Sequence, residues 1–178
     1  MKLSPAAGVF LSAMFFSMFS NAKADPLKVG DKAPEVTGTT ETGAKLNFAD
    51  VYKKQPYTLV YFYPKADTSG CTAQGCSLRD AYEQLTEKGV AVIGVSEDDV
   101  EAQKEFRDKN DFPFPLIADT DRTVVNAFGV PLMWTPIGKL AKRQAFLIKN
   151  GTVIWADYKA ATTEQAADVL KVLADQKS

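Results

Sequence analysis

The chain has 178 residues with 21 lysine and arginine against 22 aspartate and glutamate residues, and it contains no histidine. A net charge of −1 gives no electrostatic footprint for nucleic acid or for an anionic membrane. The absence of histidine excludes Cys–His nucleophile pairs, and the two cysteines fall short of the four ligands of a structural zinc site, so we expect neither a metal nor another cofactor.

The first 24 residues have the pattern of a secretory signal peptide. Lys2 supplies a short positive region, residues 6–19 form an apolar run, and residues 22–24 (Ala-Lys-Ala) have the form of a signal peptidase site. The apolar run is too short for a comfortable membrane span, so we expect cleavage; an uncleaved anchor is the alternative. Cleavage after Ala24 leaves one domain, residues 25–178, in the periplasm or outside the cell and away from the membrane.

The mature part contains segments with the composition of β-strands, namely residues 35–39, 45–48, 57–63, 90–95, 114–117, 145–148 and 152–156. The first two flank Thr42-Gly43 and predict a hairpin near the N-terminus. The segment 57–63 is continuously apolar, β-branched or aromatic, which is typical of a central strand covered on both faces. The last two flank Asn150-Gly151, a dipeptide that favours a tight hairpin turn. Residues 131–140 show no clear period and predict a loop.

Helical patterns separate these strands. They begin after Gly70, after a predicted capping box at Ser96 and Asp99, at residue 121, and after a second predicted capping box at Thr162 and Gln165. The first helical pattern ends at Gly89. Its apolar residues form one stripe at helical spacing, namely Leu78, Ala81, Tyr82 and Leu85. Strands that alternate with helices, followed by a closing hairpin and helix, predict a single α/β domain with a mixed sheet.

The two cysteines, Cys71 and Cys76, lie where the central strand hands over to the first helix. Unpaired N–H groups and the helix dipole favour a thiolate at such a position. A structural disulfide is the usual state of two cysteines in an exported protein. On a regular helix, however, residues five apart have Cα atoms about 8.6 Å apart, beyond the limit of roughly 7 Å for a disulfide. A disulfide between these cysteines requires the helix to unwind. Such a disulfide is unsuited to stabilising the fold, but it can be one state of a redox cycle.

The sequence around the cysteines resembles the peroxiredoxins. Pro64-x-x-x-Thr68-x-x-Cys71 matches the motif of their active site, and a second cysteine five residues on is similar to the bacterioferritin comigratory protein, or Q-type, subfamily. Further similarity extends over residues 29–34, 112–116, 126–130 and 143–148. The resemblance implies a thioredoxin-like fold, with a central mixed sheet flanked by helices and an N-terminal hairpin extension. It also implies a thiol-dependent peroxidase that reduces hydrogen peroxide and organic hydroperoxides.

The same resemblance implies a role for each site residue. Cys71 is the peroxidatic cysteine, Cys76 is the resolving cysteine, and the site is completed by Pro64, Thr68 and Arg143. Attack by Cys71 leaves a sulfenic acid, which Cys76 converts to an intramolecular disulfide that a thioredoxin-like or other dithiol reductant reduces. Arg143 is followed by Gln144-Ala145, where the family more often has a residue and then a small hydroxyl residue. The family comparison favours a monomer.

Two other functions stay open at this point. A thiol–disulfide oxidoreductase acting on exported proteins would share the fold and a reactive Cys71. Its usual motif is Cys-x-x-Cys, whereas four residues separate Cys71 from Cys76. A binding module with a structural disulfide would be permanently oxidised and would lose stability when the bridge is removed.

Overall fold

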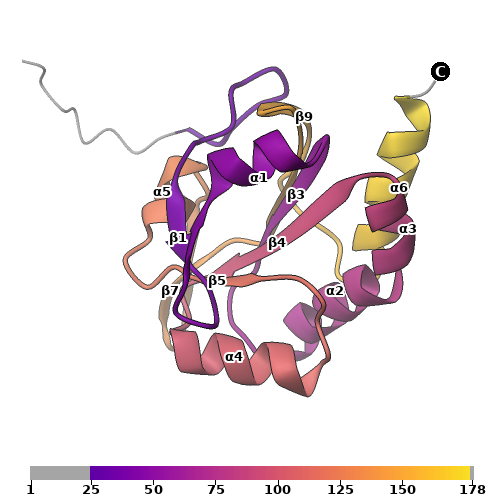
Figure 1. Ribbon diagram of the computed structural model, residues 1–178. Coiled ribbons are helices and arrows are strands. Elements are labelled where there is room, and N and C mark those ends of the chain that lie inside the picture. The colour runs from indigo at the N-terminus through magenta and orange to yellow at the C-terminus, as the bar shows by residue number, and fades with distance from the viewer. Residues whose placement is uncertain (1–24, 177–178) are drawn as a thin grey trace, which may run out of the picture.

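The computed structural model describes residues 25–176, and the predicted signal peptide, residues 1–24, lies outside them (Figure 1). The strands are β1 (Thr37–Thr39), β2 (Lys45–Asn47), β3 (Tyr57–Phe62), β4 (Val90–Ser96), β5 (Leu116–Ala118), β6 (Leu132–Thr135), β7 (Gly138–Ala141), β8 (Gln144–Lys149) and β9 (Thr152–Asp157). The helices are α1 (Phe48–Lys54), α2 (Ser69–Asp80), α3 (Tyr82–Glu87), α4 (Val100–Lys109), α5 (Thr123–Ala127) and α6 (Gln165–Asp175). Over this part of the chain, every helix is too short or too polar to cross a bilayer.

A five-stranded mixed sheet, in the order β5-β4-β3-β8-β9, forms the centre of the molecule (Figure 1). β3 pairs parallel with β4 and antiparallel with β8, so the predicted central strand lies in the middle of the sheet. The β8–β9 hairpin turns at Asn150-Gly151, where both residues have positive φ, as the dipeptide predicts. The predicted α/β fold with a mixed sheet and an N-terminal β1–β2 hairpin is therefore confirmed.

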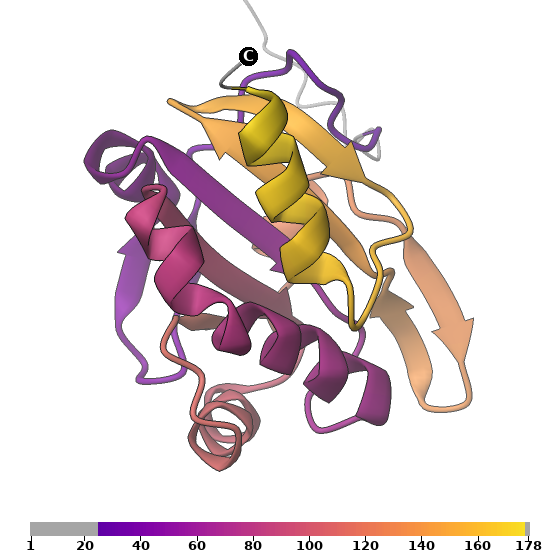
Figure 2. The same ribbon diagram turned by 90° about the vertical axis from the view of Figure 1, so that its right-hand side faces the viewer.

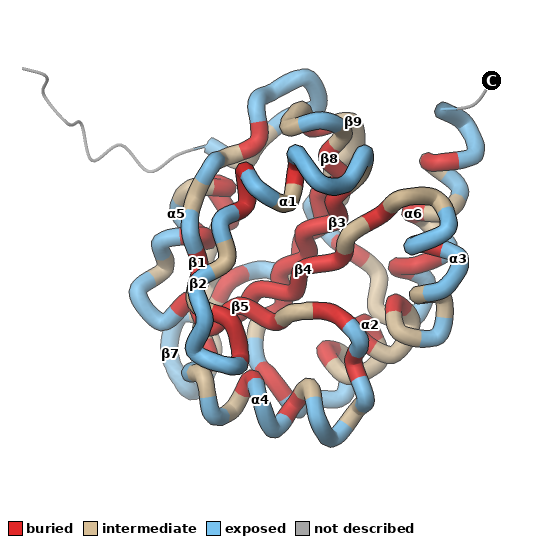
Figure 3. Tube along the Cα trace, in the orientation of Figure 1, coloured by how far each residue is buried: buried red, intermediate tan, exposed pale blue. Residues whose placement is uncertain are grey.

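Helices cover both faces of the sheet. On one face α2, α3 and α6 lie side by side (Figure 2), and Leu59, Tyr61 and Cys71 belong to the apolar cluster beneath them. On the other face Val60 and Phe62 pack with residues of α1 and α5. Successive side chains of a strand point to opposite faces, so β3 supplies both clusters, and its path through the molecule is almost entirely buried (Figure 3).

The prediction of a loop over residues 131–140 is wrong, because this segment forms the β6–β7 hairpin. Trp134 pairs with Lys139 across the two strands, and the Lys139 ammonium lies 4.4 Å from the centre of the Trp134 ring. Most of the hairpin is exposed or half-buried on both sides. Without one buried face, the sequence has no reason to alternate between apolar and polar residues, which is why the period was missing.

Helix starts and breaks also differ from the predictions. The helix after Gly70 is interrupted at Ala81 and becomes α2 and α3, although Leu78 and Leu85 are both buried as expected. Ser96 stays within β4, and α4 is capped by Asp99 alone, which accepts from the Ala102 N–H. Helix α1 was not predicted, because its seven residues are too few to show a clear period.

The second predicted capping box is wrong as well. Helix α6 begins at Gln165, its N-cap residue is Glu164, and no side chain caps it. Gln165 is instead fully buried, and its side chain faces α2. A glutamine that would be free to cap a helix is therefore committed to a contact inside the protein.

Gly129, which follows α5, generates a prediction about stability. Its φ is +64°, and a Cβ at this position would lie 2.1 Å from the carbonyl oxygen of Asp25 in the N-terminal arm. We expect Gly129→Ala to lower the free energy of unfolding by about 2 kcal/mol or more, because left-handed strain adds to a collision with backbone. The control is Gly43→Ala, where φ is +80° but nothing lies within 4 Å, and where we expect a loss of about 1 kcal/mol. Equal losses in urea unfolding would contradict the role given to the arm.

Candidate active site

The pairing of β3 with β8 determines where the site forms. Phe62, the last residue of β3, lies opposite Gln144, the first residue of β8. Arg143 immediately precedes β8 and therefore lies beside the loop that leads from β3 to α2. There the Arg143 guanidinium reaches the first turn of α2, and its Nη2 donates a hydrogen bond of 3.2 Å to the sulfur of Cys71.

Cys71 lies at a helix start that is built to stabilise negative charge. Its sulfur belongs to the apolar cluster on one face of the sheet, and the residue is only 1% exposed. Thr68 is the N-cap residue, and within the described chain its side chain makes no capping hydrogen bond. The start of α2 and the guanidinium of Arg143 thus both lie beside one buried sulfur, and each is a feature that attracts negative charge in general.

Two buried glutamines hold Arg143 in place. The guanidinium Nη1 donates to Gln74 Oε1, and Gln74 Nε2 in turn donates to Gln165 Oε1 at 2.8 Å. Both glutamines are fully buried. Sequence reasoning missed both residues. The available signal was the position of Gln74 three residues after Cys71, which places the two side chains on the same face of a helix.

Gly70 leaves the space that Arg143 needs. A Cβ on Gly70 would lie 3.3 Å from Arg143 Nη2 and 3.5 Å from Thr162 Cγ2. The first distance is tighter than ordinary van der Waals contact, so a larger residue here would push the guanidinium away from the sulfur. The glycine before Cys71 therefore has a steric role in the site.

The loop before α2 carries the other two predicted site residues. Thr68 is exposed, and its hydroxyl donates to the carbonyl oxygen of Lys65 at 3.0 Å, so its lone pairs remain available to accept a hydrogen bond from a bound molecule. Pro64 is half-buried at the start of the loop and has no N–H to compete for an anion. Asp98 fixes the loop by accepting from the Ala66 N–H at 2.7 Å.

Cys76 lies further along the same helix. Both cysteines are free, and α2 is continuous through them. Cys76 is half-buried against the apolar cluster, and a Cβ on its neighbour Gly75 would lie 2.4 Å from the ring of Phe112. The helix is therefore closely packed at Cys76, and a bond between the two sulfurs requires this part of α2 to unwind.

Two tyrosines beneath the site do not act as bases. Tyr61 and Tyr63 are fully buried in the cluster that contains Cys71. Burial raises the pKa of Tyr61 well above its usual value, and the same cause raises the pKa of Tyr63. Both phenols therefore stay neutral, and the charge that faces the sulfur comes from Arg143.

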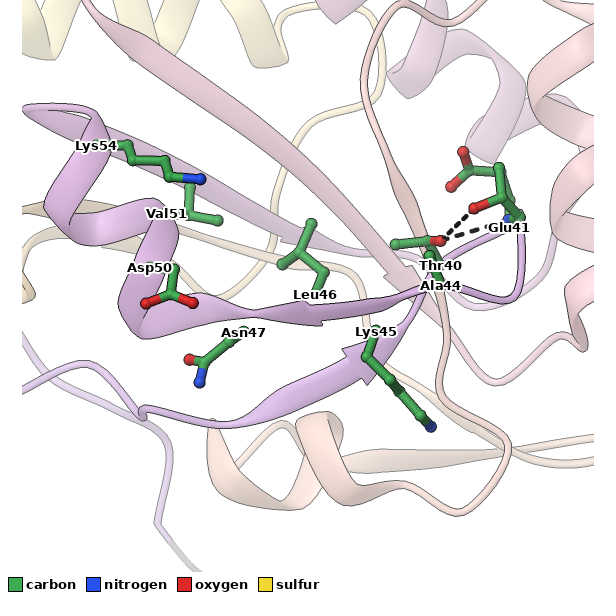
Figure 4. A pocket seen from close by; sticks show the side chains of 10 residues that line it. Thr40, Glu41, Ala44, Lys45, Leu46, Asn47, Asp50, Val51 and Lys54 are labelled. Atoms are coloured by element: carbon green, nitrogen blue, oxygen red, sulfur yellow. Dashed lines mark hydrogen bonds between the residues drawn. The ribbon is translucent and has the colours of Figure 1, made fainter.

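Two hollows of the described surface are lined by residues other than Cys71. An open hollow of about 430 Å³ lies beside the β1–β2 hairpin and α1, where it is lined by side chains such as Lys45, Asp50 and Lys54 (Figure 4). A smaller one, of about 240 Å³, borders the loop before α2 and is lined in part by Lys65 and Asp67. Neither of these two hollows is lined by a cysteine.

Comparisons with known proteins place the chain in a family. The model of the AhpC/TSA family matches residues 29–156. The chain is 41% identical over 133 residues to a putative peroxiredoxin bcp of Coxiella burnetii, covering 73% of this chain and 87% of that protein. It is 33% identical to peroxiredoxin Bcp of Bacillus subtilis, covering 84% of this chain and 96% of that protein.

Solved structures give the same result. The crystal structure of the peroxidoxin BcpB of Mycobacterium tuberculosis matches with a TM-score of 0.77 and 28% identity, and covers 85% of this chain and 99% of that one. A mutant of Xylella fastidiosa PrxQ matches with a TM-score of 0.79 and 25% identity, and covers 87% of this chain and 100% of that one. The architecture is the thioredoxin-like fold of these proteins, as the sequence predicts.

The contact between Arg143 and Cys71 predicts an effect on the reactivity of the sulfur. In a Cys76→Ser background, where Cys71 is the single thiol, we expect Arg143→Gln to slow the reaction with hydrogen peroxide about tenfold, because the donor 3.2 Å from the sulfur is lost. The matched control is Arg79→Gln on the same helix, whose guanidinium bonds Asp80 and the Asn110 carbonyl. Equal rates in both variants would show that Arg143 does not assist the reaction.

Proposed function

The chain belongs to the AhpC/TSA family, as a peroxiredoxin of the Bcp/PrxQ type, and from this premise we propose that Cys71 is the sulfur that reacts with peroxide. As a member of this family, the protein is a thiol-dependent peroxidase. The observation that carries the proposal for Cys71 is its buried sulfur at a helix start, 3.2 Å from the Arg143 guanidinium.

The first step of the proposed cycle is a displacement at oxygen. The Cys71 thiolate attacks one oxygen of hydrogen peroxide or an organic hydroperoxide, and the O–O bond breaks. The sulfur loses two electrons and becomes a sulfenic acid, while the other oxygen takes a proton and leaves as water or an alcohol. Arg143 stabilises the charge that moves from sulfur to oxygen, and Thr68 offers an acceptor for the peroxide proton. Pro64 helps to exclude water from the sulfur.

Cys76 completes the oxidative half of the cycle. Once α2 unwinds, the Cys76 thiol condenses with the Cys71 sulfenic acid, so that a disulfide forms and water leaves. A second peroxide that arrives before α2 unwinds oxidises Cys71 to the sulfinic acid. The continuous helix seen with both thiols free supports this order, because it keeps Cys76 out of reach until attack has taken place.

Peroxidases of this type use a peroxide and a dithiol reductant. We place this chain in the atypical two-cysteine class, in which the disulfide lies within one chain, and we infer a thioredoxin-like reductant and a monomeric enzyme. The alternative of an exported thiol–disulfide oxidoreductase is not favoured, since the relatives reported above are named peroxiredoxins. Four residues between the cysteines also differ from the Cys-x-x-Cys motif of that class.

Export is a further part of the proposal. The pattern of residues 1–24 supports a cleaved signal peptide, and the family match begins at residue 29, after the predicted cleavage site. In that case the peroxidase domain is residues 25–178, and the enzyme meets peroxide and its reductant in the periplasm or outside the cell.

The cycle predicts distinct oxidation products for three proteins. One equivalent of hydrogen peroxide, quenched rapidly and followed by mass spectrometry, should convert the reduced wild type to the disulfide with loss of two hydrogens. Cys76→Ser should accumulate a sulfenic acid at Cys71, and Cys71→Ser should react only as slowly as a free thiol. Equal, slow reaction of all three proteins would overturn the assignment of Cys71.

The signal peptide predicts the N-terminus of the exported protein. When the full chain is expressed in a bacterium with a general secretory pathway, the intact mass of the product should correspond to a chain that starts at Asp25, in the periplasmic fraction. Ala24→Asp, which replaces a small residue at the cleavage site, should leave the signal attached. A full-length mass in the cytoplasm for the unaltered chain would contradict export.

A further inference from the structure

The contact between α2 and the start of α6 involves residues that lie on both sides of Cys76. Gln74 Nε2 donates to Gln165 Oε1 at 2.8 Å, and the Ala166 N–H donates to Ser77 Oγ at 3.1 Å. Two neighbouring residues of α6 are therefore hydrogen-bonded to α2 two residues before and one residue after the second cysteine.

The chemistry of Arg143 determines the direction of these hydrogen bonds. A guanidinium has only donors, so the oxygen of Gln74 must face Arg143 and its amide nitrogen must face away. The amide nitrogen of Gln74 donates to Gln165, which must therefore accept with its side-chain oxygen. The orientation of Gln74, and with it the position of Arg143, consequently depends on an acceptor at residue 165.

Both glutamines are shielded from solvent. Gln74 and Gln165 are both fully buried. Within the described chain, the Gln165 Nε2 has no hydrogen-bond partner. Buried polar groups are normally paired, so an amide kept here with one group unpaired indicates that its oxygen is needed.

The same contacts oppose the movement that joins the cysteines. Cys71 and Cys76 lie on one continuous helix, and their sulfurs meet only if the turns between them unwind. Gln74 lies between the cysteines and Ser77 follows the second, so unwinding displaces both residues and breaks their bonds to Gln165 and Ala166.

From this geometry we infer that Gln165 is a positioning residue with two opposite effects on the reaction. Through Gln74 it holds Arg143 against the Cys71 sulfur and speeds attack on the peroxide. Through the same bond, together with the Ser77–Ala166 bond, it keeps α2 helical and slows formation of the disulfide. The start of α6 thereby sets how often Cys71 is oxidised further before Cys76 reaches it. This inference rests on the proposed roles of Cys71 and Cys76.

Two measurements separate these effects. In a Cys76→Ser background, the rate of sulfenic acid formation reports attack alone. In the chain that keeps both cysteines, the fraction of Cys71 converted to sulfinic acid at rising peroxide reports the competition between attack and disulfide formation. Gln165→Leu should slow attack about tenfold, roughly the effect of losing one buried hydrogen bond, and should lower the sulfinic fraction.

Ser77→Ala removes only the hydrogen bond to Ala166. It should lower the sulfinic fraction while attack stays within about twofold of the wild type, since the Ser77 hydroxyl takes no part in the hydrogen bonds that hold Gln74 and Arg143. The structural control is Leu173→Ala, a buried position of the same helix outside these contacts, which should change neither rate despite lower stability. Gln165→Met, with a thioether that is a poor acceptor, replaces Gln165→Leu if that variant does not fold.

The outcomes distinguish this inference from the proposed function. Gln165 has only a structural role if Gln165→Leu slows attack no more than Leu173→Ala does. The same conclusion follows if the sulfinic fraction stays at the wild-type level in either Gln165→Leu or Ser77→Ala. If the wild type forms no sulfenic acid at Cys71, the proposed function fails first and the inference with it.

Discussion

The hydrogen bond from the Arg143 guanidinium to the Cys71 sulfur joins two parts of the chain that are 72 residues apart. It exists because β8 pairs with β3 in a register that brings residue 143 to the end of the central strand. A slip of this register by one residue would turn every side chain of β8 to the opposite face. The alternating core of the sheet, which fixes the register on both faces, is therefore also what places a cation beside the thiol.

Burial makes this single contact effective. At the surface, water and salt would screen a guanidinium from a thiolate. Here the sulfur is almost inaccessible, and the phenols beneath it stay neutral because burial raises the pKa of Tyr61 and Tyr63. The described part of the chain thus places one permanent positive charge, the Arg143 guanidinium, and the start of α2 beside the sulfur.

Local patterns predicted the parts of the fold that have one clear environment. The apolar run of β3, the turn at Asn150-Gly151 and the spacing of Thr68 and Cys71 were all legible in the sequence. The β6–β7 hairpin was not, because it is exposed on both sides and leaves no period. Gln165 was read as a capping residue, since its commitment to Gln74 depends on how α6 docks on α2, a relation between segments 91 residues apart. The pattern of residues along the sequence does not show which distant residue a polar side chain will contact in the folded protein.

The composition of α2 explains why such partners are needed. In the proposed cycle α2 is regular during attack and then unwinds, a movement that strong local helix propensity would oppose. Gly70 and Gly75 lie within its twelve residues, and each costs about 1 kcal/mol relative to alanine. Both are required by close contacts, with Arg143 in one case and with Phe112 in the other. Weak local propensity makes the helical state depend on contacts with α6, and the two hydrogen bonds to α6 suit a helix that opens once in each round of the proposed cycle.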